Sequence, residues 1–289
     1  MALSKERHQE LMDILERTSM RPKGAKAPEY PQEYKDYRTL CTEEIVKRTV
    51  DDYEYTFYIY RAKNRTENCP IHINIHGGGF VAPHMECDTL YSCYLADRLG
   101  GIVVDLDYTT SPVAPWPVAF DQCYDASAYT FVHCAEWGGN ERCVSIGGYS
   151  AGGALAAGVA LKAGQTGDFR FNAQVLGYPP LDNKKDSLIR VLPRERELAF
   201  SALYFADDRE AMAHPYGSPS YAPDEMLAKL PRTLVITAGS CNFRFEDEEY
   251  AQRVAHAGVE VVVKRFPEMF HGFIPHLMGQ WKKAADLIV

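Results

Sequence analysis

The chain has 289 residues, of which 46% are hydrophobic and 24% are charged, so it is long enough to bury the core of one large domain. Its formal net charge is −8. Because nucleic acids and anionic membranes are bound by clustered Lys and Arg, this charge argues against both as partners and favours a small molecule.

The N-terminal residues 1–20 are charged and amphipathic, a pattern that predicts a helix and does not resemble a secretory signal. No segment approaches the roughly eighteen uninterrupted apolar residues of a membrane span. The eight cysteines include no CxxC pair and are scattered through predicted strands and helices, as is typical of reduced thiols. We therefore expect a cytoplasmic protein. The cysteines are Cys41, Cys69, Cys87, Cys93, Cys123, Cys134, Cys143 and Cys241.

A Pro- and Lys-rich connector, residues 21–38, follows the first helix. From residue 55 onward, short β-branched runs alternate with helix-length patterns. Because the strands are continuously apolar, this alternation predicts an α/β fold whose mostly parallel sheet is covered by helices on both faces. The predicted strands are 55–62, 71–75, 101–108, 143–149, 173–179, 233–237 and 259–266. If the last one is an exposed edge strand, a homodimer would be compatible with the fold.

The alternation is interrupted once, by residues 182–230, which contain no convincing strand and are interpreted as a helical insertion. Together with the N-terminal residues 1–45, this insertion is predicted to form a cap over the ends of the strands. The sequence shows neither an internal repeat nor a low-complexity tract. We therefore predict a single domain, residues 1–289, with cap elements at 1–45 and 182–230.

Residues 148–152 read Gly148-Tyr149-Ser150-Ala151-Gly152 and match G-x-S-x-G between a predicted strand and a helix of small residues. The two glycines leave room for a tight, strained turn that pushes the serine hydroxyl outward. Ser150 also precedes a helix N-terminus, where the helix dipole favours negative charge. We predict that Ser150 is a nucleophile; the alternative is an ordinary glycine-rich turn.

A second motif, His76-Gly77-Gly78-Gly79, follows the predicted strand 71–75. Consecutive glycines let backbone N–H groups point at an oxyanion, and each such donor is worth about 3–4 kcal/mol. We assign the oxyanion hole to the N–H groups of Gly78, Gly79 and Ala151. His76 is expected to order this loop through hydrogen bonds, and a flexible glycine turn is the alternative.

His271 lies in a short loop after the last predicted strand and is the expected general base. Nucleophile, acid and then histidine is the chain order of hydrolases that carry the G-x-S-x-G turn. His276 is a distant second choice. Other histidines are expected to be structural or solvated: His8, His72, His133, His214 and His256.

Five stretches share one order along the chain: HGGGF at 76–80, DLDYTTSPVAPWPVAFDQCYDA at 105–126, GYSAGG at 148–153, SPSYAPDEMLAKLPRTLVITAG at 218–239 and HGF at 271–273. Together they resemble the hormone-sensitive-lipase-like family of α/β-hydrolases, and the match is collinear from about residue 55 to 280. The resemblance implies an α/β-hydrolase fold and a carboxylesterase that acts on short to medium acyl esters, with no metal or cofactor. It also implies that the cap segments shape the acyl and alcohol pockets. Tyr149 departs from the aspartate that the family has before its serine.

The acid of the triad is missing from its expected place. The family frame A-x-x-D-x-L-x-D-E reads here from Ala238 to Glu246 without a gap, and it puts Cys241 at the position of the aspartate. Loss of that ionised acid can cost about four orders of magnitude in rate. A neutral thiol is a poor substitute, and a thiolate would need a depressed pKa.

Three alternatives remain open for the acid. In the first, another carboxylate reaches the histidine: Asp182, just past a predicted strand, is preferred, and Glu246 is second because it and Asp247 also suit the first turn of a helix. In the second, a Ser–His pair works with help from Cys241 or Asn242, slowly or on activated esters. In the third, catalysis is lost and the pocket is kept for binding.

The sequence thus predicts a serine carboxylesterase in which Ser150 forms an acyl-enzyme and His271 moves the proton. The alternative is a catalytically impaired small-molecule-binding protein on the same scaffold. A peptidase or amidase would usually need a more elaborate cap or a further domain.

Overall fold

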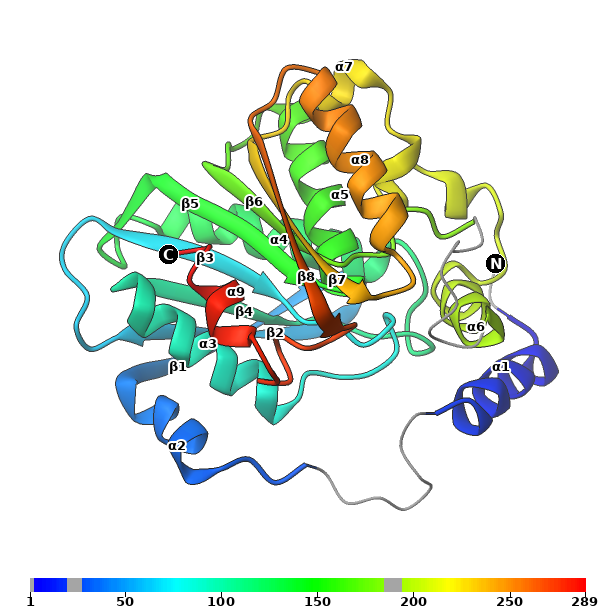
Figure 1. Ribbon diagram of the computed structural model, residues 1–289, viewed down its shortest axis with the longest axis horizontal. Helices are drawn as coiled ribbons and strands as arrows, with labels where there is room; N and C mark the ends of the chain where they lie inside the picture. The colour runs from blue at the N-terminus through cyan, green and yellow to red at the C-terminus, as the bar shows by residue number, and fades with distance from the viewer. Residues whose placement is uncertain (1–2, 20–27, 185–193) are drawn as a thin grey trace.

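An eight-stranded sheet forms the centre of the computed structural model, which describes residues 3–19, 28–184 and 194–289 (Figure 1). The strand order is β1-β2-β4-β3-β5-β6-β7-β8. The pairs β1/β2 and β2/β4 are antiparallel and all the other neighbours are parallel, so the mostly parallel sheet predicted from the sequence is confirmed. The strands are β1 (Cys41–Val50), β2 (Tyr53–Ala62), β3 (Cys69–Ile75), β4 (Ile102–Asp107), β5 (Gly139–Tyr149), β6 (Ala173–Gly177), β7 (Arg232–Ser240) and β8 (Val261–Phe270).

Strand β1 is absent from the strands predicted from the sequence. It lies at one edge of the sheet and most of its residues face solvent, so no buried apolar run marks it. It pairs with β2 across a two-residue turn formed by Asp51 and Asp52, whose φ values are 49° and 67°. Aspartate tolerates such left-handed backbone angles, which a tight hairpin between twisted strands requires.

Helices cover both faces of the sheet. Helices α4, α5 and α8 lie over one core, which includes Ile73, Leu155 and Tyr250, and α3 and α9 lie over the other, which includes Val103 and Trp281. The helices and 3-10 turns are α1 (Lys5–Arg17), α2 (Gln32–Lys35), η1 (Asp36–Leu40), α3 (Glu86–Leu99), α4 (Val118–His133), α5 (Ala151–Thr166), α6 (Arg194–Phe205), η2 (Ala211–Ala213), η3 (Pro219–Tyr221), α7 (Asp224–Leu227), α8 (Arg244–His256) and α9 (Trp281–Ala285). Of the helices in the described ranges, none has the length and apolarity needed to cross a lipid bilayer.

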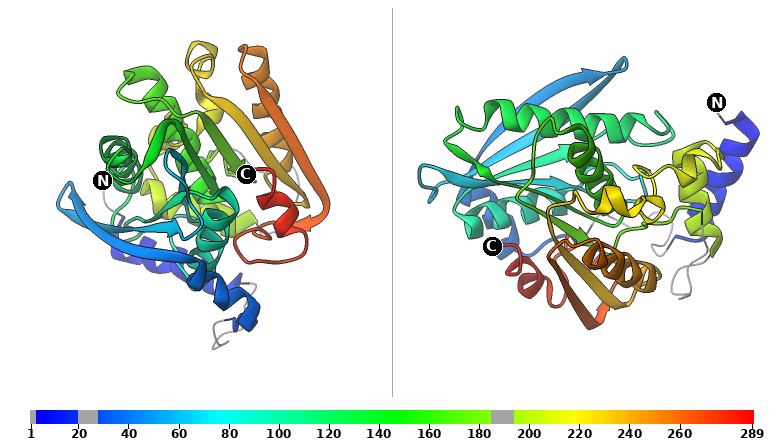
Figure 2. Two further views of the ribbon diagram at one scale, coloured as in Figure 1. Left: turned by 90° about the vertical axis from the view of Figure 1, so that its left-hand side faces the viewer. Right: turned by 90° about the horizontal axis from the view of Figure 1, so that it is seen from above.

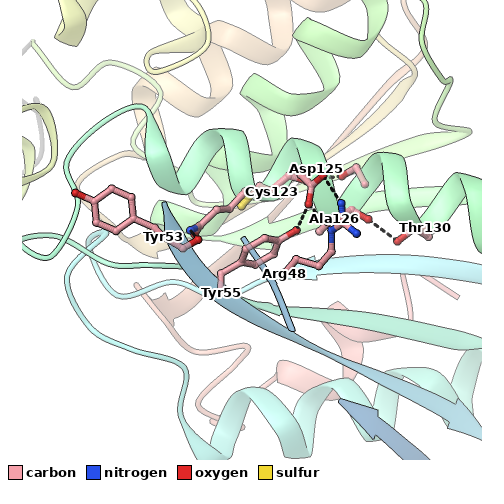
Figure 3. A network of polar contacts seen from close by, with 9 residues as sticks. Arg48, Tyr53, Tyr55, Cys123, Asp125, Ala126 and Thr130 are labelled. Atoms are coloured by element: carbon pink, nitrogen blue, oxygen red, sulfur yellow. Dashed lines mark hydrogen bonds and ion pairs between the residues drawn. The ribbon is translucent and has the colours of Figure 1, made fainter. Parts of the chain in front are cut away.

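A charged network fixes the β1–β2 hairpin to helix α4 (Figure 3). Arg48 of β1 donates hydrogen bonds from Nε and Nη2 to the two carboxylate oxygens of Asp125, over 2.5 and 2.8 Å. The hydroxyl of Tyr55, on β2, donates to Asp125 Oδ2 over 2.6 Å. Bidentate hydrogen bonds between arginine and a carboxylate are among the stronger polar interactions in proteins. We therefore expect this network to stabilise the fold.

Helices α1 and α6 lie side by side at one end of the molecule, away from the helices that cover the sheet (Figures 1 and 2). Arg17 holds Glu195 through two hydrogen bonds of 2.8 and 2.6 Å. The two helices share a small apolar cluster that contains Leu11 and Leu15 from α1 and Ala199, Ala202 and Leu203 from α6.

The predicted cap segment 1–45 is divided in the structure. Its helix α1 packs on α6, from the second predicted cap segment, whereas α2 and η1 lie near α3 and α9 on the sheet. Residues 41–45 belong to strand β1. Parts of both predicted segments, residues 20–27 and 185–193, lie outside the described residues.

Candidate active site

Ser150 lies in a sharp turn between β5 and α5, where its backbone has φ 54° and ψ −127°. That conformation is strained for a residue with a side chain, and it persists because the surrounding packing enforces it. A Cβ on Gly152 would lie 2.0 Å from the carbonyl oxygen of Ile75, and a Cβ on Gly148 would lie 2.4 Å from the backbone of Gly152. Both glycines of the motif are therefore required by close approach of the backbone.

The glycine loop after β3 lies directly against this turn. A Cβ on Gly77 would lie 2.7 Å from the carbonyl oxygen of Tyr149 and 3.3 Å from Cβ of Ser150. Gly78 and Gly79 have φ values of 117° and 64°, which favour glycine. Within the described part of the chain, the N–H groups of Gly78, Gly79 and Ala151 donate to no acceptor. These three donors are therefore available to a ligand.

His76 holds the glycine loop. Its Nδ1–H donates to the carbonyl oxygen of Gly77 over 2.7 Å, and its ring stacks on that of Tyr108 with centroids 4.3 Å apart. Burial lowers the pKa of His76 to about 4, so the ring is neutral near pH 7. This geometry agrees with an ordering function for His76.

The structure brings Ser150, His271 and Cys241 together in a chain of contacts. Nε2 of His271 lies 2.8 Å from Oγ of Ser150, and Nδ1 of the same ring lies 3.1 Å from Sγ of Cys241. Cys241 directly follows β7 and His271 directly follows β8, so two adjacent strand ends place these side chains. Both ring nitrogens of His271 are engaged.

Burial keeps both partners of the His271–Cys241 contact neutral near pH 7. It lowers the pKa of His271 to about 4, with a smaller contribution from His276. It also raises the pKa of the Cys241 thiol well above its usual range, and the carboxyl of Asp247 adds to this. The contact therefore joins an uncharged imidazole to an uncharged thiol.

A neutral thiol does not select the tautomer of the imidazole. If S–H donates to Nδ1, the proton of the ring sits on Nε2, which then cannot accept a proton from Ser150. If Nδ1–H donates to sulfur, Nε2 is free to accept that proton. An ionised carboxylate at Cys241 would permit only the second arrangement.

The two carboxylates considered from the sequence have other partners. Oδ1 of Asp182 accepts a hydrogen bond from the N–H of Lys184 over 3.1 Å. Oε1 of Glu246 accepts one from the N–H of Leu181 over 3.0 Å, and burial raises the pKa of Glu246 to about 8. Glu246 thus supports the backbone after β6. The structure brings neither carboxylate to a ring nitrogen of His271, because Ser150 and Cys241 occupy those positions.

Aromatic residues that no sequence motif singled out surround His271. The rings of Tyr178 and Phe243 lie 5.0 and 5.4 Å from the imidazole, centroid to centroid. The hydroxyl of Tyr178 accepts a hydrogen bond from the N–H of Ile274, in the loop that carries the histidine. Tyr149, which stands in place of the family's aspartate, hydrogen-bonds through its hydroxyl to that of Tyr91. The φ of 41° at Tyr178 is a strain signal that only the structure reveals.

A cavity of about 1100 Å³ opens over Ser150 and His271. The glycine loop forms part of its wall, and helices α1 and α6 form another part, so the α1–α6 pair covers the site. Apolar side chains from these helices that line it include Met12, Leu15, Leu198 and Phe200. In the described ranges, no three His, Cys, Asp or Glu side chains are grouped so that they could hold a metal ion.

Known proteins resemble this chain in both sequence and structure. The sequence profile of a family described as alpha/beta hydrolase fold matches residues 72–275, a range that includes the glycine loop, Ser150, Cys241 and His271. An arylesterase of Saccharolobus solfataricus is 28% identical over 236 residues, which are 79% of this chain and 76% of that protein.

A shorter match joins the chain to the hormone-sensitive lipase of Homo sapiens, with 37% identity over 95 residues, or 33% of this chain and 9% of the lipase. The hyperthermophilic esterase from the archaeon Pyrobaculum calidifontis superposes with a TM-score of 0.81 at 27% identity, covering 100% of this chain and 97% of that one.

Proposed function

Because the chain belongs to the alpha/beta hydrolase fold family and is a serine hydrolase of the carboxylesterase type, we propose that it hydrolyses short to medium acyl esters through an acyl-enzyme on Ser150. The resemblance to hormone-sensitive-lipase-like hydrolases is confirmed by these relatives. The observation that carries the proposal is the 2.8 Å contact between Ser150 Oγ and His271 Nε2, in a strained turn beside the glycine loop.

Each site residue has a defined role in this proposal. Ser150 Oγ attacks the ester carbonyl while Nε2 of His271 takes its proton. The N–H groups of Gly78, Gly79 and Ala151 stabilise the oxyanion, which is usually the largest single contribution to such a reaction. His271 then gives the proton to the leaving alcohol, and a water molecule hydrolyses the acyl-enzyme by the same route.

The geometry favours a Ser–His pair assisted by the thiol of Cys241 over a relocated acid. The 3.1 Å contact with Nδ1 of His271 supports this, together with the other partners of Asp182 and Glu246. Such a pair lacks the ionised group that stabilises the imidazolium, so turnover should be slow compared with a full triad. The same neutral thiol supports the second candidate function, an impaired hydrolase that mainly binds small molecules.

Two further proposals concern where and how the protein works. All eight cysteines are free thiols, which supports work in the reducing cytoplasm. Strand β8 is an edge of the sheet, and Val262 and Val263 on it are exposed, which supports pairing with a second copy.

Turnover of p-nitrophenyl acetate, butyrate and octanoate, measured against a Ser150→Ala control, tests the esterase proposal. We expect release of p-nitrophenol above that control on at least the shorter chains. Binding of these esters without turnover above the control would instead support the binding function.

A further inference from the structure

Asp88 places a buried carboxyl group on the wall of the cavity that contains Ser150. It is in the first turn of α3, and its residue surface is only 3% exposed. Oδ2 accepts a hydrogen bond from the N–H of Met85 over 2.8 Å. Among the described residues, no hydrogen bond to Oδ1 accompanies the one that Oδ2 accepts. A carboxyl oxygen on a cavity wall that the protein leaves unpaired is available to a ligand, and its charge would stabilise a cation there.

The groups around Asp88 carry an excess of negative charge. The imidazole of His84 donates from Nε2 to Asp105 Oδ2 over 2.8 Å, and Asp105 Oδ1 accepts from Asn74 over 2.8 Å. Asp105 thereby raises the pKa of His84 to about 9, although burial alone would lower it. Asp107, at the end of β4, also influences the pKa of Asp88. One imidazolium therefore faces three carboxyl groups.

The side chains that line the rest of the cavity also carry more negative than positive charge. Within the described residues, the only Lys or Arg on its wall is Arg196. The guanidinium of Arg196 donates to the carbonyl oxygen of Leu15 over 2.7 Å and lies over the ring of Phe200. These contacts hold it within the α1–α6 pair. The acidic residues on the wall are Asp13, Glu16, Asp88, Asp182 and Glu197.

We propose that Asp88 binds a cationic ammonium group of the substrate, which makes the cavity selective for positively charged esters over neutral esters of the same shape. This inference rests on the proposed esterase function and names its substrate class. A cation is favoured over a hydroxyl because it offsets the excess negative charge of the carboxyl groups, which a neutral hydroxyl cannot do.

Selectivity for a cation should depend on pH. Burial raises the pKa of Asp88 to about 7, so its carboxyl gains a proton as the pH falls from 8 to 6. Other groups near it are His84, Asp105, Asp107 and the contact between Cys87 Sγ and His276 Nδ1, which spans 3.6 Å. Since His84 stays protonated over this range, the preference for a cation should weaken as the pH falls.

Two matched pairs of esters test the proposal, one with the ammonium group in the acyl part and one with it in the leaving group. One pair is the p-nitrophenyl esters of 4-(trimethylammonio)butyric acid and 5,5-dimethylhexanoic acid, which differ in charge and not in shape. The other is butyrylthiocholine and its neutral isostere, 3,3-dimethylbutyl thiobutyrate. The readout is the ratio of kcat/KM for the cation to kcat/KM for the isostere. We expect a ratio well above one for at least one pair, and a fall of about tenfold in Asp88→Asn.

The Asp88→Asn variant removes the charge and keeps an oxygen that can accept from Met85, so helix α3 should remain capped. Asp13→Asn is the matched control, because Asp13 lies on the exposed part of the same cavity wall. Its ratio should stay within about twofold of the wild-type value, since exposed charges are screened. Equal falls in the two variants would mean that general charge, and not Asp88, sets the ratio, and would overturn the proposal.

Binding to a Ser150→Ala protein separates this inference from the esterase proposal. The ratio of Kd values for the thioester pair, measured by calorimetry, does not need turnover. Tighter binding of the cation, lost in Ser150→Ala/Asp88→Asn, would support the role of Asp88 even if no ester were hydrolysed. Hydrolysis of neutral esters with no preference for either cation would overturn the inference and leave the esterase function intact.

Discussion

Replacing Cys241 with aspartate is expected to turn the Ser–His pair into a full triad. Sγ of Cys241 already lies 3.1 Å from Nδ1 of His271, so a side chain at this position points at the nitrogen that an acid would hold. A carboxylate there accepts from Nδ1–H and fixes the tautomer whose Nε2 can take the proton of Ser150. It also stabilises the imidazolium that forms during attack.

The magnitude follows from the environment of His271. Burial lowers its pKa to about 4, well below the ordinary range of histidine. Each pKa unit that an ionised partner restores is worth about 1.4 kcal/mol, or tenfold in an equilibrium constant. If the carboxylate raises the pKa of His271 by about two to three units, the imidazolium formed during attack is stabilised by the same factor. We therefore expect kcat to rise by about 10²–10³-fold. This lies within the roughly 10⁴-fold that loss of a triad aspartate can cost.

The assay is kcat/KM for p-nitrophenyl butyrate between pH 4 and 9. A general base works only when it is unprotonated, so the wild-type rate should decline only near pH 4, and the decline should move to higher pH in Cys241→Asp. Cys241→Asn is the control, because it has the shape of aspartate without its charge and should bring no gain. A folded Cys241→Asp protein no faster than Cys241→Asn would refute the reasoning.

Three other predictions concern the turn at the nucleophile and the stability of the fold. In Gly152→Ala, a Cβ only 2.0 Å from the oxygen of Ile75 should displace the nucleophile and lower kcat by about 100-fold or more, and near-normal turnover would contradict this. Asp247 is fully buried, neither of its carboxyl oxygens has a hydrogen-bonding partner in the described chain, and burial raises its pKa well above the usual range. The folded chain thus keeps a proton that the unfolded chain releases, so stability is lost as the pH rises above about 4, by about 1.4 kcal/mol per unit up to the folded pKa. Urea unfolding between pH 5 and 8 should show this slope reduced in Asp247→Asn, and an unchanged slope would show that Asp247 is not its source. Asp125→Ala leaves Arg48 without its two-pronged partner and should cost about 1–2 kcal/mol in urea unfolding. Asp224→Ala, whose side chain is 77% exposed, should cost less than about 0.5 kcal/mol, and equal losses would contradict the account.

The inner strands β3, β4 and β6 could be predicted from the sequence because they are almost entirely buried and read as apolar runs, and the edge strand β8 could be predicted from its run of valines. Strand β1 could not, since it is an edge strand whose charged residues face water. The contact between Ser150 and His271 could also be predicted, because a glycine-flanked serine and a histidine after the last strand are local sequence patterns whose side chains this fold brings together. The structure places these two side chains 2.8 Å apart.

The residue that contacts Nδ1 of His271 could not be predicted from the sequence. Whether Asp182, Glu246 or Cys241 reaches this nitrogen depends on the path of the backbone and not on residue type. Glu246 accepts a hydrogen bond from the N–H of Leu181, and Asp182 accepts one from the N–H of Lys184. Of the three side chains, only the thiol of Cys241 contacts the imidazole of His271. Asp88 carries no motif at all, and its importance follows from burial and the cavity alone.

Mass spectrometry of the protein mixed with p-nitrophenyl butyrate and quenched in acid within the first turnover tests the central claim most directly. The account predicts a butyryl group attached to Ser150, found in the peptide that contains residues 148–152, and no such adduct in Ser150→Ala. A wild-type protein that releases p-nitrophenol with no acyl group on Ser150, or with the same adduct pattern in Ser150→Ala, would contradict it.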